Sequence, residues 1–187
     1  MRILIYYGTT EGQTRKIAEF AAGLLKGDDV TVVDAANVPA DLDLDRFDAA
    51  ILAASLHMHK YQSAMVQFAR DHYSKLNTIP SLFISVSLSA AGDDPEDRKG
   101  LAECEQKFRA ETEWTPNQVL EVAGAFRFTK YDFFKSWVMR RIAKEKKFKL
   151  GPHEDLELTD WQALERDIRA FRAQLNAASR EKGSARA

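Results

Sequence analysis

The sequence predicts a doubly wound α/β fold, with a five-stranded parallel sheet in the order 2-1-3-4-5 between two layers of helices. Apolar runs of strand length alternate with helical patterns along the chain, which is typical of a parallel sheet covered on both faces. The first strand also leads through a short loop of small and hydroxyl residues directly into a helix. Such a loop is typical of the ligand-binding edge of these sheets.

Each element has its own pattern. The apolar run at 2–7 predicts the first strand, and helical periodicity follows it at 12–26. The next strand, 29–34, alternates apolar and polar residues, which predicts an edge position, whereas 48–54 is continuously apolar and therefore central, like 2–7. The same alternation then predicts helix 62–76, strand 81–87, helix 94–112, strand 119–124 and helix 160–176.

The composition is that of one compact domain. With 187 residues, 45% of them hydrophobic, the chain can bury one core, and we expect that domain at 1–178 and a small, polar, disordered tail at 179–187. The net charge of −1 gives no global field for nucleic acid. A single cysteine, Cys104, excludes an internal disulfide and fits a reducing cytosol. Because there is no signal-like segment and no long apolar run, we expect a cytoplasmic protein.

The loop after the first strand predicts a phosphate site. Backbone N–H groups at the start of a helix, together with the helix dipole, hold anions. The loop has neither the lysine of a nucleoside-triphosphate site nor the three glycines of a dinucleotide site, so hydroxyl and backbone donors must bind the phosphate. This chemistry suits flavin mononucleotide (FMN), although an ordinary strand-to-helix turn is the alternative. The predicted phosphate-binding residues are Thr9, Thr10, Glu11, Gly12, Gln13 and Thr14.

Two further loops should meet the first one. They follow the third and fourth strands at 55–61 and 87–92, and ligands of doubly wound sheets bind at these carboxyl ends. Small and apolar residues there would flank a flavin ring. Two histidines without a third ligand make an incomplete metal site, so no metal is expected. The predicted ring neighbours are Ser55, Leu56, His57, Met58, Ser87, Leu88, Ser89, Ala90 and Gly92.

At these residues the chain resembles the flavodoxin superfamily, and it is most similar to the flavodoxin-type, quinone-dependent protoporphyrinogen dehydrogenases. The similar segments are Gly12–Arg15, Ala54–Leu56 with Lys60-Tyr61, Pro80–Val86, Ala123–Phe128 with Tyr131, and Thr159–Trp161. There are two departures. Glu11 replaces a threonine, and its carboxylate is tolerable near a phosphate only if the side chain points to solvent. His57-Met58-His59 stands where the narrower family often has Arg-Tyr-Gly.

The resemblance implies a flavodoxin-like FMN enzyme that oxidises protoporphyrinogen IX and passes electrons to a quinone. It also places Arg127 near the flavin, where it could pair with a substrate carboxylate or form a structural salt bridge. Two alternatives stay open at this point. One is a flavodoxin-like electron carrier that docks protein partners, and the other is a degenerate binding module that has lost flavin.

An insertion at about 125–158, between the fifth strand and the last helix, is too long for a plain connection. Residues 129–150 carry eight basic and two acidic side chains. Three interpretations remain: core or homodimer contacts, docking on an anionic membrane or covering of quinone and porphyrinogen, and single-stranded nucleic acid binding. Membrane docking would make the protein peripheral on the inner face of the cytoplasmic membrane. The candidate contact residues are Tyr131, Phe134, Trp137, Arg140 and Arg141.

Overall fold

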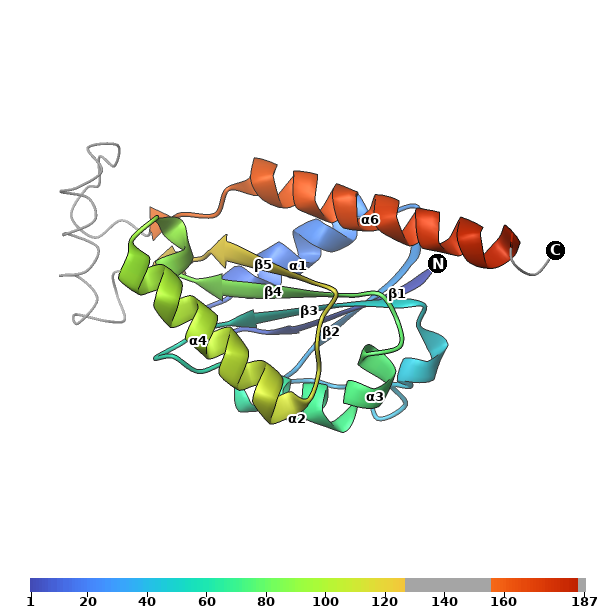
Figure 1. Cartoon of the computed structure of the whole chain (residues 1–187), viewed down its shortest axis with the longest axis horizontal. Coiled ribbons are helices and arrows are strands. Elements are labelled where there is room, and N and C mark those ends of the chain that lie inside the picture. Colours follow the sequence, from blue (N-terminus) through green and yellow to red (C-terminus); the bar gives the residue numbers. More distant parts are fainter. Residues whose placement is uncertain (127–155, 185–187) are drawn as a thin grey trace.

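The computed structural model describes residues 1–126 and 156–184 (Figure 1). Its main strands are β1 (Arg2–Gly8), β2 (Asp29–Asp34), β3 (Ala49–Ser55), β4 (Ser81–Ser87) and β5 (Gln118–Ala123). The helices are α1 (Gln13–Leu24), α2 (Ser63–Asp71), α3 (Tyr73–Leu76), α4 (Pro95–Thr112) and α6 (Trp161–Ser184), with short 3-10 turns at Leu44–Arg46 and Ser89–Ala91.

The sheet confirms the predicted topology. Its five strands are all parallel and lie in the order β2-β1-β3-β4-β5. In the centre, Ile5 of β1 lies between Val32 of β2 and Ile51 of β3. Every residue of β1 from Ile3 to Gly8 and every residue of β3 up to Ala54 is buried, because both faces of the central strands are covered. The alternating strand β2 lies at the edge, as predicted.

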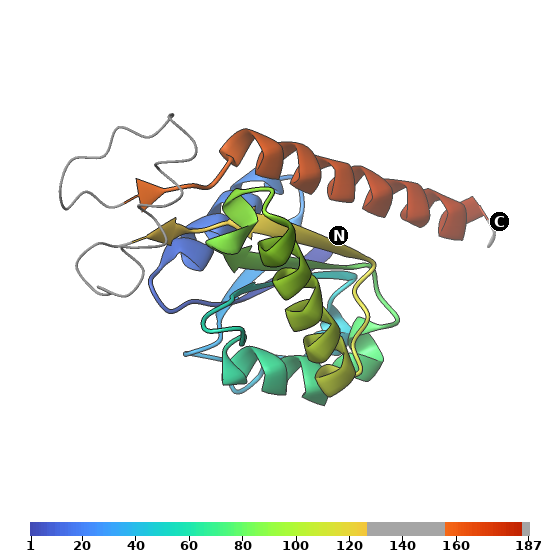
Figure 2. The ribbon, with the colours of Figure 1, turned by 60° about the vertical axis from the view of Figure 1, so that its left-hand side comes forward.

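Helices cover the two faces of the sheet in two layers, as Figures 1 and 2 show. On one face α1 and α6 contribute Ile17, Ile168 and Phe171 to an apolar core. On the other face the core is largely aromatic, and Phe83 of β4 contacts Phe108 of α4 and Trp114 just beyond α4. The sheet is therefore packed on both faces, and this packing fixes the positions of the carboxyl ends of its strands.

Two helices differ from the predicted ranges. The single helix expected at 62–76 is divided at His72 into α2 and α3. The helix α6 runs to Ser184, beyond the expected end at 176 and into the segment 179–187 that we expected to be a disordered tail. Ala177, Ala178, Arg180 and the residues that follow are mostly good helix formers, so the helix continues where composition alone suggests disorder.

A small antiparallel pair that the sequence did not predict joins the two ends of the insertion. The strand β6 (Ala125–Phe126) pairs with β7 (Leu156–Glu157), with Ala125 opposite Glu157. The segment 127–155 between them lies outside the described residues. So do the predicted contact residues of the insertion, which are Arg127, Tyr131, Phe134, Trp137, Arg140 and Arg141.

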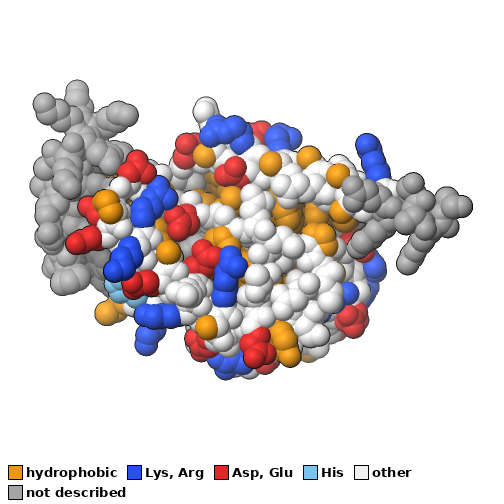
Figure 3. Space-filling view, viewed as in Figure 1, with side chains coloured by type: hydrophobic (Ala, Val, Ile, Leu, Met, Phe, Trp, Pro, Cys, Tyr) orange, Lys and Arg blue, Asp and Glu red, His pale blue; other side chains and the backbone are white. Residues whose placement is uncertain are grey.

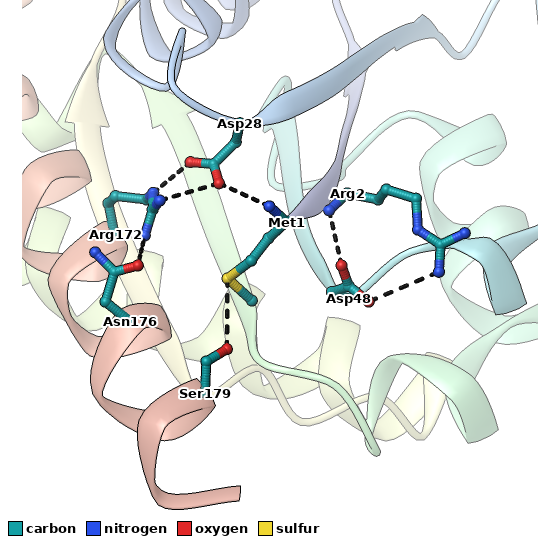
Figure 4. Close-up of polar contacts among 7 residues, drawn as sticks. All are labelled: Met1, Arg2, Asp28, Asp48, Arg172, Asn176 and Ser179. Atoms are coloured by element: carbon teal, nitrogen blue, oxygen red, sulfur yellow. Dashed lines mark hydrogen bonds and ion pairs between the residues drawn. The ribbon is translucent and has the colours of Figure 1, made fainter. Parts of the chain in front are cut away.

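A buried carboxylate connects the amino-terminal strand to the last helix (Figure 4). The Asp28 side chain is only 1% exposed, and it accepts hydrogen bonds from the Met1 ammonium at 3.0 Å and from Arg172, whose Nη2 lies 3.0 Å from Asp28 Oδ1. The Arg172 Nε donates to the second carboxylate oxygen, and Nη1 donates to Asn176. Both oxygens of the buried carboxylate are thereby paired.

Replacing Arg172 with methionine should lower the free energy of unfolding by about 2 kcal/mol, because Asp28 loses two charge-assisted hydrogen bonds while staying buried. The matched control is Arg169→Met on the same helix. Arg169 pairs with Glu165 in an exposed i,i+4 contact at 2.8 Å, which should contribute only about 0.3–0.5 kcal/mol. Urea unfolding of both variants measures the difference, and equal effects would contradict the importance of the buried pair.

Of the helices in the described part of the chain, none has the length and apolar character needed to cross a bilayer. The face seen in Figure 3 carries lysine, arginine, aspartate and glutamate side chains intermingled over α4 and α6. No single sign of charge dominates that face.

Candidate functional site

The three loops predicted to meet do so at the carboxyl ends of β1, β3 and β4. Together they line one pocket, which the start of β6 also borders. Of the predicted residues, twelve line this pocket: Thr9, Thr10, Glu11, Gln13, Thr14, Ser55, Leu56, His57, Met58, Ser87, Leu88 and Ser89. Gly12, Ala90 and Gly92 belong to the same loops but are not among the lining residues. The pocket is also lined by His59, which belongs to the predicted loop 55–61, and by three residues that were not predicted, Val86, Gly124 and Ala125.

The first loop leaves polar donors directed at the pocket. Gly12 precedes α1 with a left-handed backbone, φ 92°, and no side chain caps the helix. Its N–H donates to Thr9 Oγ1 at 2.9 Å, which closes the loop. Thr14 is 1% exposed, and its hydroxyl has no hydrogen-bond partner among the described residues. An orphaned, buried hydroxyl beside uncapped helix amides is suited to an anionic ligand.

The Glu11 side chain does not simply point to solvent. It lines the pocket, and its Oε1 is buried without a hydrogen-bond partner in the described structure. A buried carboxylate oxygen without a donor is costly. The residue that departs from the superfamily pattern therefore faces the site rather than avoiding it.

The first and second loops are joined by Gln62, which was not predicted as a site residue. The Gln62 amide donates to Thr10 Oγ1 at 3.2 Å and to Ser55 Oγ. The side chain also lies against Gly8, where an added Cβ would be 3.1 Å from Gln62 Oε1. No motif marks a glutamine just before a helix, so only the folded structure brings it between the loops.

The second loop forms a tight turn with two hydrogen bonds between His57 and Lys60, N to O at 2.8 and 3.0 Å. Its central residues, Met58 and His59, both have left-handed backbones, φ 47° and 61°, which non-glycine residues rarely adopt. From α4, the Cys104 thiol lies 3.6 Å from the His59 carbonyl oxygen and 3.8 Å from Nδ1. The turn presents Met58, 77% exposed, at the pocket.

The third loop and the end of β5 lie close together. The Ser87 hydroxyl accepts from the Ala90 N–H at 3.1 Å, and the Ser87 carbonyl accepts from Gly124 at 3.0 Å. A Cβ on Gly124 would lie 3.3 Å from Val86 Cγ1, so the close approach favours glycine. Ala90 thus stabilises the third loop through its backbone N–H and does not line the pocket.

At the end of the second loop, the Tyr61 hydroxyl forms a hydrogen bond with Ser85 Oγ at 2.9 Å. Burial raises the pKa of Tyr61 to about 12, with the Ser85 hydrogen bond acting in the opposite direction. The tyrosine is therefore neutral at physiological pH. Its ring meets Phe83 edge-on at 5.1 Å, which connects the second loop to the aromatic core.

The segment before α6 is anchored to the first loop. Gln13 donates to Thr159 Oγ1 at 2.9 Å, and that hydroxyl donates to the Ala123 carbonyl at 2.6 Å. Beside this chain of bonds, Lys16 pairs with Glu157 at 2.9 Å, and hydrogen bonds from Lys16 and Trp161 lower the pKa of the Glu157 carboxyl although burial opposes the shift. The start of α1, the end of β5 and β7 are therefore held as one unit.

Charge in the pocket is sparse. The described lining residues include one acid, Glu11, and two histidines, His57 and His59, but no lysine or arginine. A ligand phosphate held by these residues would be bound by N–H and O–H donors, as the sequence predicts.

Comparison with known proteins gives concordant results. Residues 4–150 match the family model of the flavodoxin domain. The protoporphyrinogen IX dehydrogenase (quinone) of Escherichia coli is 31% identical over 167 residues, which cover 88% of this chain and 91% of that protein. The enzyme of the same name from Leishmania major is 26% identical, over 92% of this chain and 75% of its own length.

A solved structure agrees on the fold. The flavodoxin of Fusobacterium nucleatum, bound to flavin mononucleotide, is similar with a TM-score of 0.51 at 12% identity. The match covers 96% of this chain and 98% of that one. At this identity the likeness concerns the fold alone.

Proposed function

The chain belongs to the flavodoxin family and, within it, to the family of quinone-dependent protoporphyrinogen IX dehydrogenases, and on this basis we propose that it is an FMN-dependent enzyme that oxidises protoporphyrinogen IX and passes the electrons to a quinone. The observation that carries the proposal is the likeness to the Escherichia coli enzyme over nearly the full length of both chains. The activity belongs to haem biosynthesis.

The pocket supports FMN as the cofactor. The orphaned Thr14 hydroxyl and the uncapped amides of α1 offer donors to a phosphate, and Gly12 adopts a backbone conformation that lets the loop turn inward. The loops 55–61 and 87–92 supply Leu56, Met58 and Leu88 as apolar neighbours for a ring. We propose that the residues that line this pocket form the cofactor site, with Gly12, Ala90 and Gly92 as supports.

Bound flavin would supply the redox chemistry, by accepting a hydride from the donor and releasing electrons to the acceptor. The residues of this chain bind and orient. Gln62 fixes the first loop against the second through Thr10 and Ser55, and Gln13 fixes the first loop against the end of β5 through Thr159. No described side chain has to act as a catalytic acid or base.

The test is anaerobic mixing of the flavin-loaded protein with protoporphyrinogen IX. The visible flavin absorbance should bleach as the donor is oxidised, and a soluble quinone should restore it. If a flavodoxin reductase bleaches the flavin but the porphyrinogen does not, the protein is an electron carrier instead. The intermingled charges of the face in Figure 3 offer no single-signed docking patch there for such a carrier.

We further propose that residues 129–150 dock the protein on the anionic inner face of the cytoplasmic membrane. A quinone dissolved in the bilayer would be accessible to the protein there. Eight basic and two acidic residues, with Phe133, Phe134 and Trp137, combine charge with apolar area. The insertion also begins at the pocket, because Ala125 both lines it and starts β6. An acceptor bound at the membrane would then lie near the proposed cofactor.

The protein should sediment with anionic vesicles at low salt, and the bound fraction should fall as salt rises because the attraction is screened. Changing Lys144, Lys146 and Lys147 to glutamate should abolish sedimentation, since each base contributes about 1 kcal/mol near an anionic surface. Neutral phosphatidylcholine vesicles are the control. Binding that ignores both salt and the triple change would instead favour an apolar cover or a homodimer contact.

A further inference from the structure

The loop that precedes α1 contains an acid where the proposed ligand has its own negative charges. Glu11 lines the pocket, and its Oε1 is buried without a partner among the described residues. Thr14, three residues on, is also buried with an orphaned hydroxyl. Two unpartnered polar oxygens, one in the loop and one in the first turn of α1, lie beside uncapped helix amides and indicate a site that is complete only with a ligand.

Among the described residues, the two bases that follow Glu11 along the chain have other carboxylate partners. On α1, which follows the loop, Arg15 pairs with Glu19 and Lys16 pairs with Glu157. From the second loop, the titratable side chains that line the pocket are His57 and His59, and the ring of His59 lies 3.8 Å from Cys104 Sγ. The third loop contributes hydroxyl and apolar side chains to the lining, without an acid or a base.

An ionised Glu11 beside a phosphate dianion would be strongly unfavourable in a partly buried site. A protonated carboxyl is different, because its O–H can donate a hydrogen bond to a phosphate oxygen. It would then fill the role of the hydroxyl that the loop lacks at this position.

We propose that Glu11 and the flavin phosphate share one proton in the complex, in a hydrogen bond between a carboxyl oxygen and a phosphate oxygen, so that binding of the phosphate takes up one proton from solution. The balance is simple: the free protein, one proton and the phosphorylated ligand give a complex that holds one proton between Glu11 and the phosphate. This inference rests on the proposed FMN site, and it makes Glu11 a residue that links cofactor affinity to pH.

The experiment measures the affinity of the apoprotein for FMN and for riboflavin, which lacks the phosphate, by quenching of flavin fluorescence between pH 6 and 9. The matched variant is Glu11→Gln, whose amide is a permanent donor. The ratio of the FMN affinity of Glu11→Gln to that of the wild type should rise about tenfold per pH unit from pH 6 to 7.5. Because the ligand and every other residue are the same in both proteins, the ratio isolates the effect of Glu11.

Three further measurements complete the test. For riboflavin, the same ratio should stay constant with pH. Calorimetry in buffers of different ionisation enthalpy should show uptake of close to one proton per FMN at pH 7 by the wild type, and none by Glu11→Gln. Thr14→Val should weaken FMN several-fold at every pH without changing its pH dependence relative to the wild type.

A pH-independent ratio for FMN would overturn the inference and would mean that Glu11 and the phosphate share no proton. A ratio that changes equally for riboflavin would also overturn it, because the effect would not involve the phosphate. If neither flavin binds to any of the variants or to the wild type, the proposed function itself fails. The failure of the inference and the failure of the function are thus distinguishable.

Discussion

Replacing Phe83 with alanine should lower the free energy of unfolding by about 3–5 kcal/mol, because a buried aromatic side chain is deleted from a well-packed site. Phe83 has no exposed surface. It stacks on Phe108 at 4.8 Å and meets the edges of Trp114 at 5.6 Å and Tyr61 at 5.1 Å. The cavity would lie between β4 and α4, where rigid backbone on both sides limits collapse.

Urea unfolding of the apoprotein measures this change. Tyr73→Ala is the matched control, because Tyr73 is an aromatic residue on the same side of the sheet but is 40% exposed, and its loss should cost well under about 1 kcal/mol. Similar losses for the two variants would show that the aromatic cluster does not hold this layer. Because Tyr61 connects the cluster to the second loop, Phe83→Ala should also weaken flavin binding.

The sheet could be predicted because its strands have two distinct patterns. The runs Ile3–Tyr7 and Ala49–Ala54 are apolar throughout and are central in the structure, whereas β2 alternates and lies at the edge. The ends of the helices were harder to predict from the sequence. Asp94 and Pro95 mark the start of α4 clearly, but nothing so definite marks the end of α6, so composition suggested a tail where the chain continues as a helix.

The place of the site followed from topology, while several of its parts did not. Parallel strands bring their carboxyl ends to one edge, so three loops distant in the sequence could be expected to meet. Gln62 and Gly124 were missed because their roles come from contacts across loops, which leave no local pattern. The β6–β7 pair has two residues per strand, too few to show any periodicity.

The backbone conformation of the second loop could not be predicted from the sequence either. Met58 and His59 adopt left-handed conformations that usually call for glycine or asparagine, so their residue types argue against the turn that forms. Tertiary contacts compensate, since Cys104 contacts His59 from α4 and His57 bonds to Lys60. Local propensity is often overridden in this way at functional sites.

Replacing Gly12 with valine should reduce FMN affinity by more than tenfold, which corresponds to at least about 1.4 kcal/mol of binding free energy. Gly12 has φ 92°, and a β-branched residue is strongly disfavoured in that region. The loop would have to turn differently, which would displace the Gly12 N–H from Thr9 Oγ1, now 2.9 Å away, and move the amides at the start of α1. The added methyl groups would also obstruct a phosphate.

Two variants separate these causes. Gly12→Asn should lose less affinity, because asparagine tolerates the left-handed conformation. Gly23→Ala adds a Cβ to the same helix at a site with no heavy atom within 4 Å, so it should leave FMN affinity unchanged and stabilise α1 by about 0.5–1 kcal/mol. Fluorescence titration with FMN measures all three variants. Wild-type affinity in Gly12→Val would mean that the phosphate does not lie against this loop, and the cofactor would have to be placed elsewhere in the pocket.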